Sequence, residues 1–152
     1  LMQLGAELCI DTVDLVLSTD GDVPSQPQQE SEAHHVAPKI FKETCAIDFS
    51  LSAKRIYDFV RGLSPVPGAW CMLTPRDAQA KAQVLKVYKA AKTGESSNGV
   101  EVGTLKAENR RLLVATVDEW LELVELQPAG KKRMAARDYL NGFQHPEDFL
   151  LK

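Results

Sequence analysis

Residues 111–126 read RLLVATVDEWLELVEL. Two runs rich in aliphatic, β-branched and aromatic side chains flank the polar pair Asp118-Glu119, a pattern typical of two short strands joined by a turn. We interpret this pair as a solvated turn and not as a catalytic acid and base. In the second run, Val124 breaks the alternation of apolar and acidic residues, which predicts a β-bulge.

Similar runs precede this pair along the chain. They cover residues 69–73, 82–90 and 100–105, and turn signals such as Thr93-Gly94 and Ser97-Asn98-Gly99 separate the strands. Five short, closely spaced strands favour a mainly β fold, either a small barrel or a sandwich. Closing the sheet into a barrel removes its exposed edges.

Short helices are expected on both sides of these strands. Upstream, Ser50 can cap a helix that Gly62 ends, and its apolar face is predicted to lie on the sheet. That face holds Ile56, Phe59, Val60 and Leu63, and the opposite face holds Lys54, Asp58 and Arg61. Downstream, residues 134–142 are predicted to form a helix, with Phe143, Phe149 and Leu150 packing the C-terminus against the domain.

The first 38 residues lack the strand pattern of the rest of the chain. Residues 1–17 are predicted to form a helix with apolar side chains on two sides, and residues 18–38 to form a linker rich in Ser, Gln and Pro. We interpret the helix as the last one of an absent body, and residues 39–152 as a separate domain. Exposed Leu4, Leu8 and Leu15 would then let the helix self-associate.

The charge is divided in the same way. The 152 residues carry a net charge of −3, from 18 basic and 21 acidic side chains. Residues 1–37 hold seven acids and no Lys or Arg (−7), so the rest of the chain holds 18 − 14 = +4. A basic domain suits an anionic partner. No run approaches the roughly 20 apolar residues of a membrane helix, so no membrane partner is expected.

Motifs for catalysis or metal binding are missing from the sequence. It has no glycine-rich phosphate loop, no G-x-S-x-G and no H-E-x-x-H. Cys9, Cys45 and Cys71 form no C-x-x-C pair, so reduced and mostly buried thiols are expected. His34-His35 lies in the polar linker and is interpreted as solvated, so no metal site is predicted.

A basic cluster at residues 127–133, QPAGKKR, is the clearest functional signal. Lys131, Lys132 and Arg133 follow one another on a Pro-Gly turn, and Arg137 follows one helical turn later if a helix continues from Arg133. Such a cluster suits a phosphate backbone, and small Greek-key barrels often bind oligonucleotides. A solubilising surface turn is the alternative interpretation.

Two stretches carry a family resemblance. Residues 125–134, ELQPAGKKRM, with 136–142, ARDYLNG, resemble the C-terminal signature of the methionyl-tRNA formyltransferase family. Residues 37–40, APKI, 47–50, IDFS, and 61–70, RGLSPVPGAW, resemble that family as well. The resemblance is thin between about residues 74 and 117, and residues 73–81 look longer than the usual hairpin of the family.

The resemblance implies a C-terminal domain with an open, OB-like Greek-key barrel that binds initiator methionyl-tRNA, in the cytoplasm of a bacterium or in an organelle. The formyl donor of the family, 10-formyltetrahydrofolate, and its Asn-His-Asp catalytic set belong to the N-terminal domain. We therefore expect no cofactor in this chain and no formyl transfer by the chain alone.

The resemblance also indicates which residues would meet the RNA. Lys131 and Lys132 match the basic turn of the family, and Lys39 matches its basic linker. Charge and spacing add Arg133, Arg137, Lys42, Lys54 and Arg61 as candidates. The alternative is a structural or interaction appendage of a related formyl-folate enzyme, one that acts on a sugar nucleotide or on formyltetrahydrofolate. In that case the cations form a solvated rim.

Overall fold

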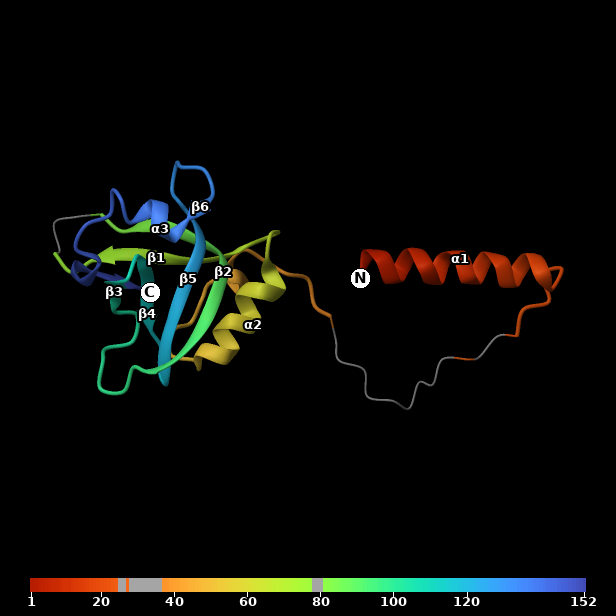
Figure 1. Ribbon diagram of the computed structural model, residues 1–152, viewed down its shortest axis with the longest axis horizontal. Coiled ribbons are helices and arrows are strands. Elements are labelled where there is room, and N and C mark those ends of the chain that lie inside the picture. The colour runs from red at the N-terminus through yellow and green to blue at the C-terminus, as the bar shows by residue number, and fades with distance from the viewer. Residues whose placement is uncertain (25–26, 28–36, 78–80) are drawn as a thin grey trace. The chain divides into compact units, whose positions relative to one another are not determined.

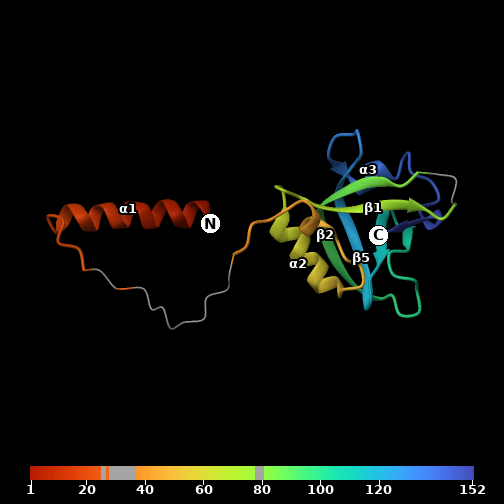
Figure 2. The same ribbon diagram turned by 180° about the vertical axis from the view of Figure 1, so that it is seen from behind.

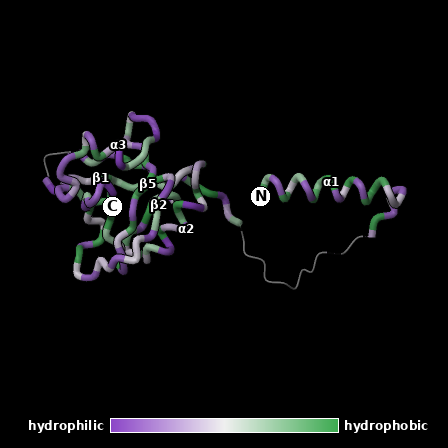
Figure 3. The backbone as a smooth tube through the Cα atoms, viewed as in Figure 1, coloured by the Kyte–Doolittle hydropathy of each residue, from purple (hydrophilic) through white to green (hydrophobic). Residues whose placement is uncertain are grey.

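The computed structural model describes residues 1–24, 27, 37–77 and 81–152, in two units, Leu1–Pro38 and Lys39–Lys152. The first unit contains helix α1 (Met2–Ser18), none of whose side chains is buried. Apolar and polar residues alternate along α1 (Figure 3). Its self-association stays a prediction, and His34-His35 lies outside the described residues.

The second unit is a mainly β fold with few, short helices (Figure 1). Its elements in chain order are η1 (Glu43–Cys45), α2 (Ala53–Leu63), β1 (Ala69–Pro75), β2 (Gln83–Ser96), β3 (Leu105–Glu108), β4 (Arg111–Ala115), β5 (Glu119–Pro128), β6 (Met134–Ala135), α3 (Ala136–Tyr139), η2 (Pro146–Asp148) and β7 (Phe149–Leu151).

The strands form one sheet that curls into a nearly closed barrel. Its order is β3-β4-β5-β2-β1-β7, and β6 pairs with β5. Strands β2 to β5 form a Greek key, because β2 lies beside β5 and not beside β3. Figure 2 shows β1 and β2 side by side, as their antiparallel register requires. The OB-like Greek-key barrel expected from the sequence is confirmed.

Closure of the barrel depends on Gly103. The Leu151 N–H donates to the Gly103 carbonyl (2.9 Å), and Thr104 bridges Leu150, so the two ends of the sheet meet. Gly103 has φ of +85°, and a Cβ there would overlap the Leu151 carbonyl oxygen. The strand predicted over residues 100–105 is therefore wrong, because the chain turns at Gly103 and the ladder of β3 with β4 begins at Leu105.

Helix α2 covers one side of the barrel, against β2 (Figure 1). Its apolar face is buried and Lys54 and Arg61 face solvent, as predicted. The predicted ends are corrected. The N-cap is Ser52, whose hydroxyl accepts from the Arg55 N–H, because Ser50 instead bonds Asp48. Gly62 lies inside the helix, which ends at Leu63.

Two further expectations concern β5 and the residues after it. The bulge at Val124 is confirmed, since Leu123 pairs with Ala90 and Glu125 with Lys89, leaving Val124 without a partner on β2. The helix predicted over residues 134–142 is wrong at its start. Met134–Ala135 forms β6 on the edge of β5, and α3 covers only Ala136–Tyr139.

Candidate nucleic-acid interface

The loop between β5 and β6 carries the basic cluster and projects from the barrel (Figure 1). The Ala129 N–H donates to the Val84 carbonyl and the Lys131 N–H to the Pro128 carbonyl, both at 3.1 Å. Gly130, with φ of +73°, makes the turn possible. Within the described part of the chain, the exposed Lys131 and Lys132 form no ion pair, so their charges are available to a partner.

Gln127 holds this loop against the barrel. Its amide Nε2 donates to the Lys131 carbonyl (2.9 Å), and its Oε1 accepts from the Tyr88 hydroxyl (2.8 Å). Both polar ends of the side chain are satisfied, one by the loop and one by β2. The backbone that carries the two lysines is therefore fixed before any ligand arrives.

Arg133 forms an ion pair within the domain, unlike the two lysines beside it. Its guanidinium pairs with Glu125 and lies 4.4 Å from the centre of the Tyr88 ring. The hydrogen bond from Arg133 holds the pKa of the Glu125 carboxyl below its usual range. Since Met134–Ala135 forms strand β6 and α3 begins only at Ala136, the helical ridge predicted from Arg133 to Arg137 is wrong.

The cations of α2 lie on a neighbouring surface. Lys54 and Arg61 share one carboxylate, Asp58, at 2.8 and 3.3 Å. The two cations lower the pKa of the Asp58 carboxyl, and the hydrogen bond from Lys54 contributes most. Arg61 lines a hollow of about 340 Å³ between α2 and β2, together with Tyr88 and Lys89, whereas Lys54 does not. Tyr88 thus connects Arg61 with the basic loop.

Lys39 and Lys42 lie before η1. Lys39 Nζ lies 5.4 Å from the centre of the Phe41 ring. Lys42 lines a hollow of about 360 Å³ with Trp70 and Lys86. A second hollow, of about 200 Å³, shares Lys86 with the first and continues to residues 127–130. This shared lining connects Lys42 to the basic loop.

We call Lys42, Lys86, Lys131 and Lys132 the lysine face. Among the residues that the structure describes, none of the four forms an ion pair. The prediction missed Lys86 and Tyr88, and it included Gln127 in the basic cluster without giving it a role. One signal for them was present, because Lys86 and Tyr88 alternate with the buried Leu85 and Val87 on β2 and so point away from the core.

Arg137 lies apart from the lysine face. It lines a different hollow, of about 410 Å³, with Arg110, Arg111 and Glu122. Its guanidinium is 3.7 Å from the Asp138 carboxylate. The structure therefore brings together Lys42, Lys131 and Lys132, with Arg61 and Arg133 beside them, and leaves Lys54 and Arg137 outside that cluster.

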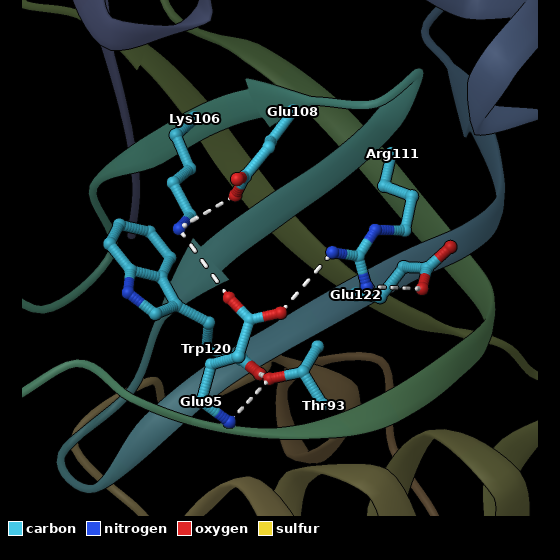
Figure 4. Close-up of polar contacts among 7 residues, drawn as sticks. All are labelled: Thr93, Glu95, Lys106, Glu108, Arg111, Trp120 and Glu122. Carbon is cyan, nitrogen blue, oxygen red and sulfur yellow. Dashed lines mark hydrogen bonds and ion pairs between the residues drawn. The ribbon is translucent and has the colours of Figure 1, made fainter.

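One group of outward-facing charges from strands β2 to β5 is paired internally (Figure 4). We call this the paired face; it consists of Glu95, Lys106, Glu108, Arg111 and Glu122. Glu95 accepts from Arg111 (3.2 Å) and lies 3.8 Å from Lys106, which also pairs with Glu108 (3.1 Å). Lys106 Nζ lies 4.4 Å from the centre of the Trp120 ring, over a small apolar cluster of Leu113, Ala115 and Trp120.

Asp118 lies in the turn before β5, and its carboxylate accepts hydrogen bonds from distant and neighbouring residues. Its Oδ1 accepts from the Ala53 N–H (2.9 Å) at the start of α2 and from the Thr116 hydroxyl (2.8 Å). These hydrogen bonds, the first above all, lower the pKa of the carboxyl. The interpretation as a solvated turn is incomplete, because Asp118 attaches α2 to the barrel.

Cys45 and Cys71 are buried free thiols and Cys9 is exposed, as expected for mostly buried thiols. Burial raises the pKa of the Cys71 thiol. Among the described residues no three His, Cys, Asp or Glu side chains are grouped to hold a metal ion, and no helix is long and apolar enough to cross a membrane.

Comparison with known proteins places these features in context. Residues 39–144 match the family model described as formyl transferase, C-terminal domain. A protein of Parabacteroides distasonis named methionyl-tRNA formyltransferase is 45% identical over 99% of this chain and 47% of its own length. Relatives of that name from Phocaeicola vulgatus and Bacteroides fragilis are 43% and 40% identical, over 95% and 100% of this chain and 44% and 47% of theirs. The chain spans about half the length of these curated relatives.

Proposed function

The chain belongs to the formyl transferase C-terminal domain family, and from this premise we propose that it is the tRNA-binding domain of a methionyl-tRNA formyltransferase. Residues 39–152 bind and orient initiator methionyl-tRNA. Formyl transfer from 10-formyltetrahydrofolate takes place on another domain of that enzyme. The reaction prepares the tRNA for translation initiation, in the bacterial cytoplasm or an organelle.

The observation that carries this proposal is the lysine face. Its four cations have no carboxylate partner in the described chain, and the hydrogen bonds of Gln127 hold the loop that presents two of them. A phosphate backbone is a row of regularly spaced anions, and lysines that replace its counterions gain affinity from their release. Lysines already paired with carboxylates would gain less.

Such a surface orients the tRNA and leaves its sequence largely unread. Contacts with phosphates set the register of a nucleic acid on a protein but carry no base information. The lysine face and Arg61 together supply five cations at the surface of one barrel. Selection of the initiator tRNA and the chemistry then belong to other contacts.

The test is fluorescence anisotropy of labelled initiator methionyl-tRNA with the 152-residue chain, repeated over a range of salt concentrations. Each phosphate contact contributes about 0.9 to the slope of log K against log salt. Replacing Lys131 and Lys132 by Gln should therefore lower the slope by about 2 and the affinity roughly sixty-fold at about 0.1 M salt.

The matched control is Lys106→Gln, which removes one lysine of the paired face. Its salt slope should equal that of the unmodified chain, because Lys106 already contacts Glu95 and Glu108. Binding that is independent of salt, or unaffected by loss of both loop lysines, would show that the proposed function is wrong.

A further inference from the structure

The hollow beside Lys42 has an apolar wall that the lysine face does not explain. Phe41, Pro67 and Trp70 line it, with Lys42 and Lys86 among its other lining residues. At about 360 Å³ it falls within the range of roughly 300–1,000 Å³ that is usual for ligand pockets. An apolar wall flanked by cations is suited to a ligand with a flat apolar part and a negative charge.

Phe41 exposes 54% of its surface, although its backbone is held firmly. Its N–H donates to the Thr44 hydroxyl (3.1 Å), and its carbonyl accepts from that hydroxyl (2.8 Å) and from the Cys45 thiol (3.2 Å). The ring therefore lies on a fixed backbone and stays largely exposed, with Lys39 Nζ 5.4 Å from its centre. Binding to such a ring orders little of the protein, which lowers the entropic cost.

Trp70 is held at the other side of the same hollow. Its indole N–H donates to the Lys42 carbonyl (2.8 Å), which satisfies the one polar atom of the side chain and fixes its direction. The hydrogen bond also attaches the segment that carries Phe41 to strand β1. Two aromatic side chains from distant parts of the sequence thus line one hollow.

The charges around the hollow favour an anionic ligand. Its described lining contains Lys42 and Lys86 and no acidic residue. Lys86 also lines the hollow that continues to Gln127 and Gly130 in the basic loop. A nucleic acid strand following the lysines would therefore pass this apolar wall.

We propose that the Phe41–Trp70 hollow binds one unstacked nucleobase of the RNA, with the adjoining phosphates near Lys42 and Lys86. This inference rests on the proposed function. Proteins recognise single-stranded RNA by stacking splayed bases on aromatic side chains, a contact that tolerates any base because every base has a π-face. The site adds a preference for unpaired nucleotides to a surface that otherwise attracts phosphates of any strand.

The test uses the 152-residue chain and a fluorescein-labelled, single-stranded oligoadenylate. Phe41→Ala should weaken binding about five-fold or more and leave the salt slope unchanged, because stacking on an aromatic residue contributes about 1–3 kcal/mol and displaces no counterions. Val117→Ala is the matched control, since Val117 is an apolar residue exposed to the same degree (55%) and lies outside the described lining of the hollow. It should bind as the unmodified chain does.

Tryptophan fluorescence supplies a second readout. The chain has two tryptophans, and Trp120 is 8% exposed on the paired face. In Trp120→Phe, which leaves Trp70 alone, the oligoadenylate should quench the emission. Inorganic polyphosphate, which has the charge but no bases, should not. Thermal unfolding of each variant shows whether it remains folded.

Three results would overturn the inference. If Phe41→Ala binds normally while loss of Lys131 and Lys132 weakens binding, the base site is wrong and the proposed function stands. If polyphosphate quenches Trp70 as oligoadenylate does, the hollow responds to charge alone. If Phe41→Ala changes only the oligomeric state of the chain, the hollow is a protein contact. Absence of RNA binding by the unmodified chain would instead contradict the proposed function itself.

Discussion

The lysine face and the paired face belong to the same barrel and are both rich in cations, yet their charges are used differently. On the paired face, Lys106 contacts Glu95 on β2 and Glu108 on its own strand, and Arg111 contacts Glu95 as well. On the lysine face, Lys86, Lys131 and Lys132 contact none within the described residues. The comparison shows that cations on one barrel can be bound to carboxylates or left without them, and our proposal assigns the RNA to the face where they are left without them.

The paired face has a structural role because its side chains cover apolar residues. Leu113 is fully buried although it points away from the main core, beside Trp120. Lys106 lies directly across from Leu113 in the β3–β4 register, and Glu122 lies across from it on β5. The long stems of such side chains exclude water from apolar groups while their charged ends stay solvated.

The largest expected effect tests this role. Leu113→Ala should lower the free energy of unfolding by about 2–5 kcal/mol, the usual cost of deleting a fully buried leucine side chain. Val66→Ala, at an exposed position, should change it by less than about 0.5 kcal/mol. Chemical denaturation measures both. If the two substitutions lowered the free energy of unfolding equally, the paired face would not be covering a buried apolar cluster.

A smaller effect is expected for the charges of the paired face. Lys106→Gln should lower the free energy of unfolding by about 1 kcal/mol or less, because exposed ion pairs contribute little and the cation–π contact with Trp120 adds a modest amount. The loss should shrink at high salt, which screens the pairs with Glu95 and Glu108. Lys132→Gln should leave unfolding unchanged at any salt concentration.

On the lysine face, Tyr88→Phe should reduce tRNA affinity about two- to five-fold without changing the salt slope. The change removes the hydroxyl that donates to Gln127 and keeps the ring under Arg133, so the loop is held less firmly while its charges remain. Tyr57→Phe is the matched control, because Tyr57 lines the same hollow between α2 and β2 as Tyr88. A changed slope of log K against log salt would mean that Tyr88 affects the number of phosphate contacts.

The smallest effect concerns pH. Arg133 lowers the pKa of Glu125, so this pair stabilises the fold above the usual glutamate pKa, and that contribution is lost as the pH falls through the lowered folded value. Below about pH 4.5 the unmodified chain should therefore lose slightly more stability than Glu125→Gln does. Thermal unfolding midpoints across acidic pH measure the difference. If the midpoints of the two proteins fall in parallel with pH, the Arg133–Glu125 pair contributes nothing to stability.

Much of the barrel was predictable because its elements follow local patterns. Alternation placed residues 111–116 and 120–126 on strands, and the phase break at Val124 marked the bulge. The apolar face of α2 was predictable in the same way. The errors fell where tertiary contacts compete with local preference. Ser50 bonds Asp48 and leaves the cap to Ser52, and Met134 joins β5 as a strand.

The candidate site was predictable only in part. The run Lys131-Lys132-Arg133 is visible in the sequence because its cations are adjacent. Lys86 is not, since a single lysine on a strand has no distinguishing neighbour until the barrel places it beside the loop. Arg133 was assigned to the same group as the lysines, and only its pairing with Glu125 sets it apart.

The sequence by itself determined the apolar runs that form β1, β2, β4 and β5, the amphipathic face of α2 and the position of the basic turn. These properties depend on residues within a few positions of one another, where periodicity and turn chemistry act directly. The tertiary structure alone decided which cations are free and that Phe41 and Trp70 line one hollow. Strand order brings together residues as distant as Ala53 and Asp118, and the partner of a charge depends on that order.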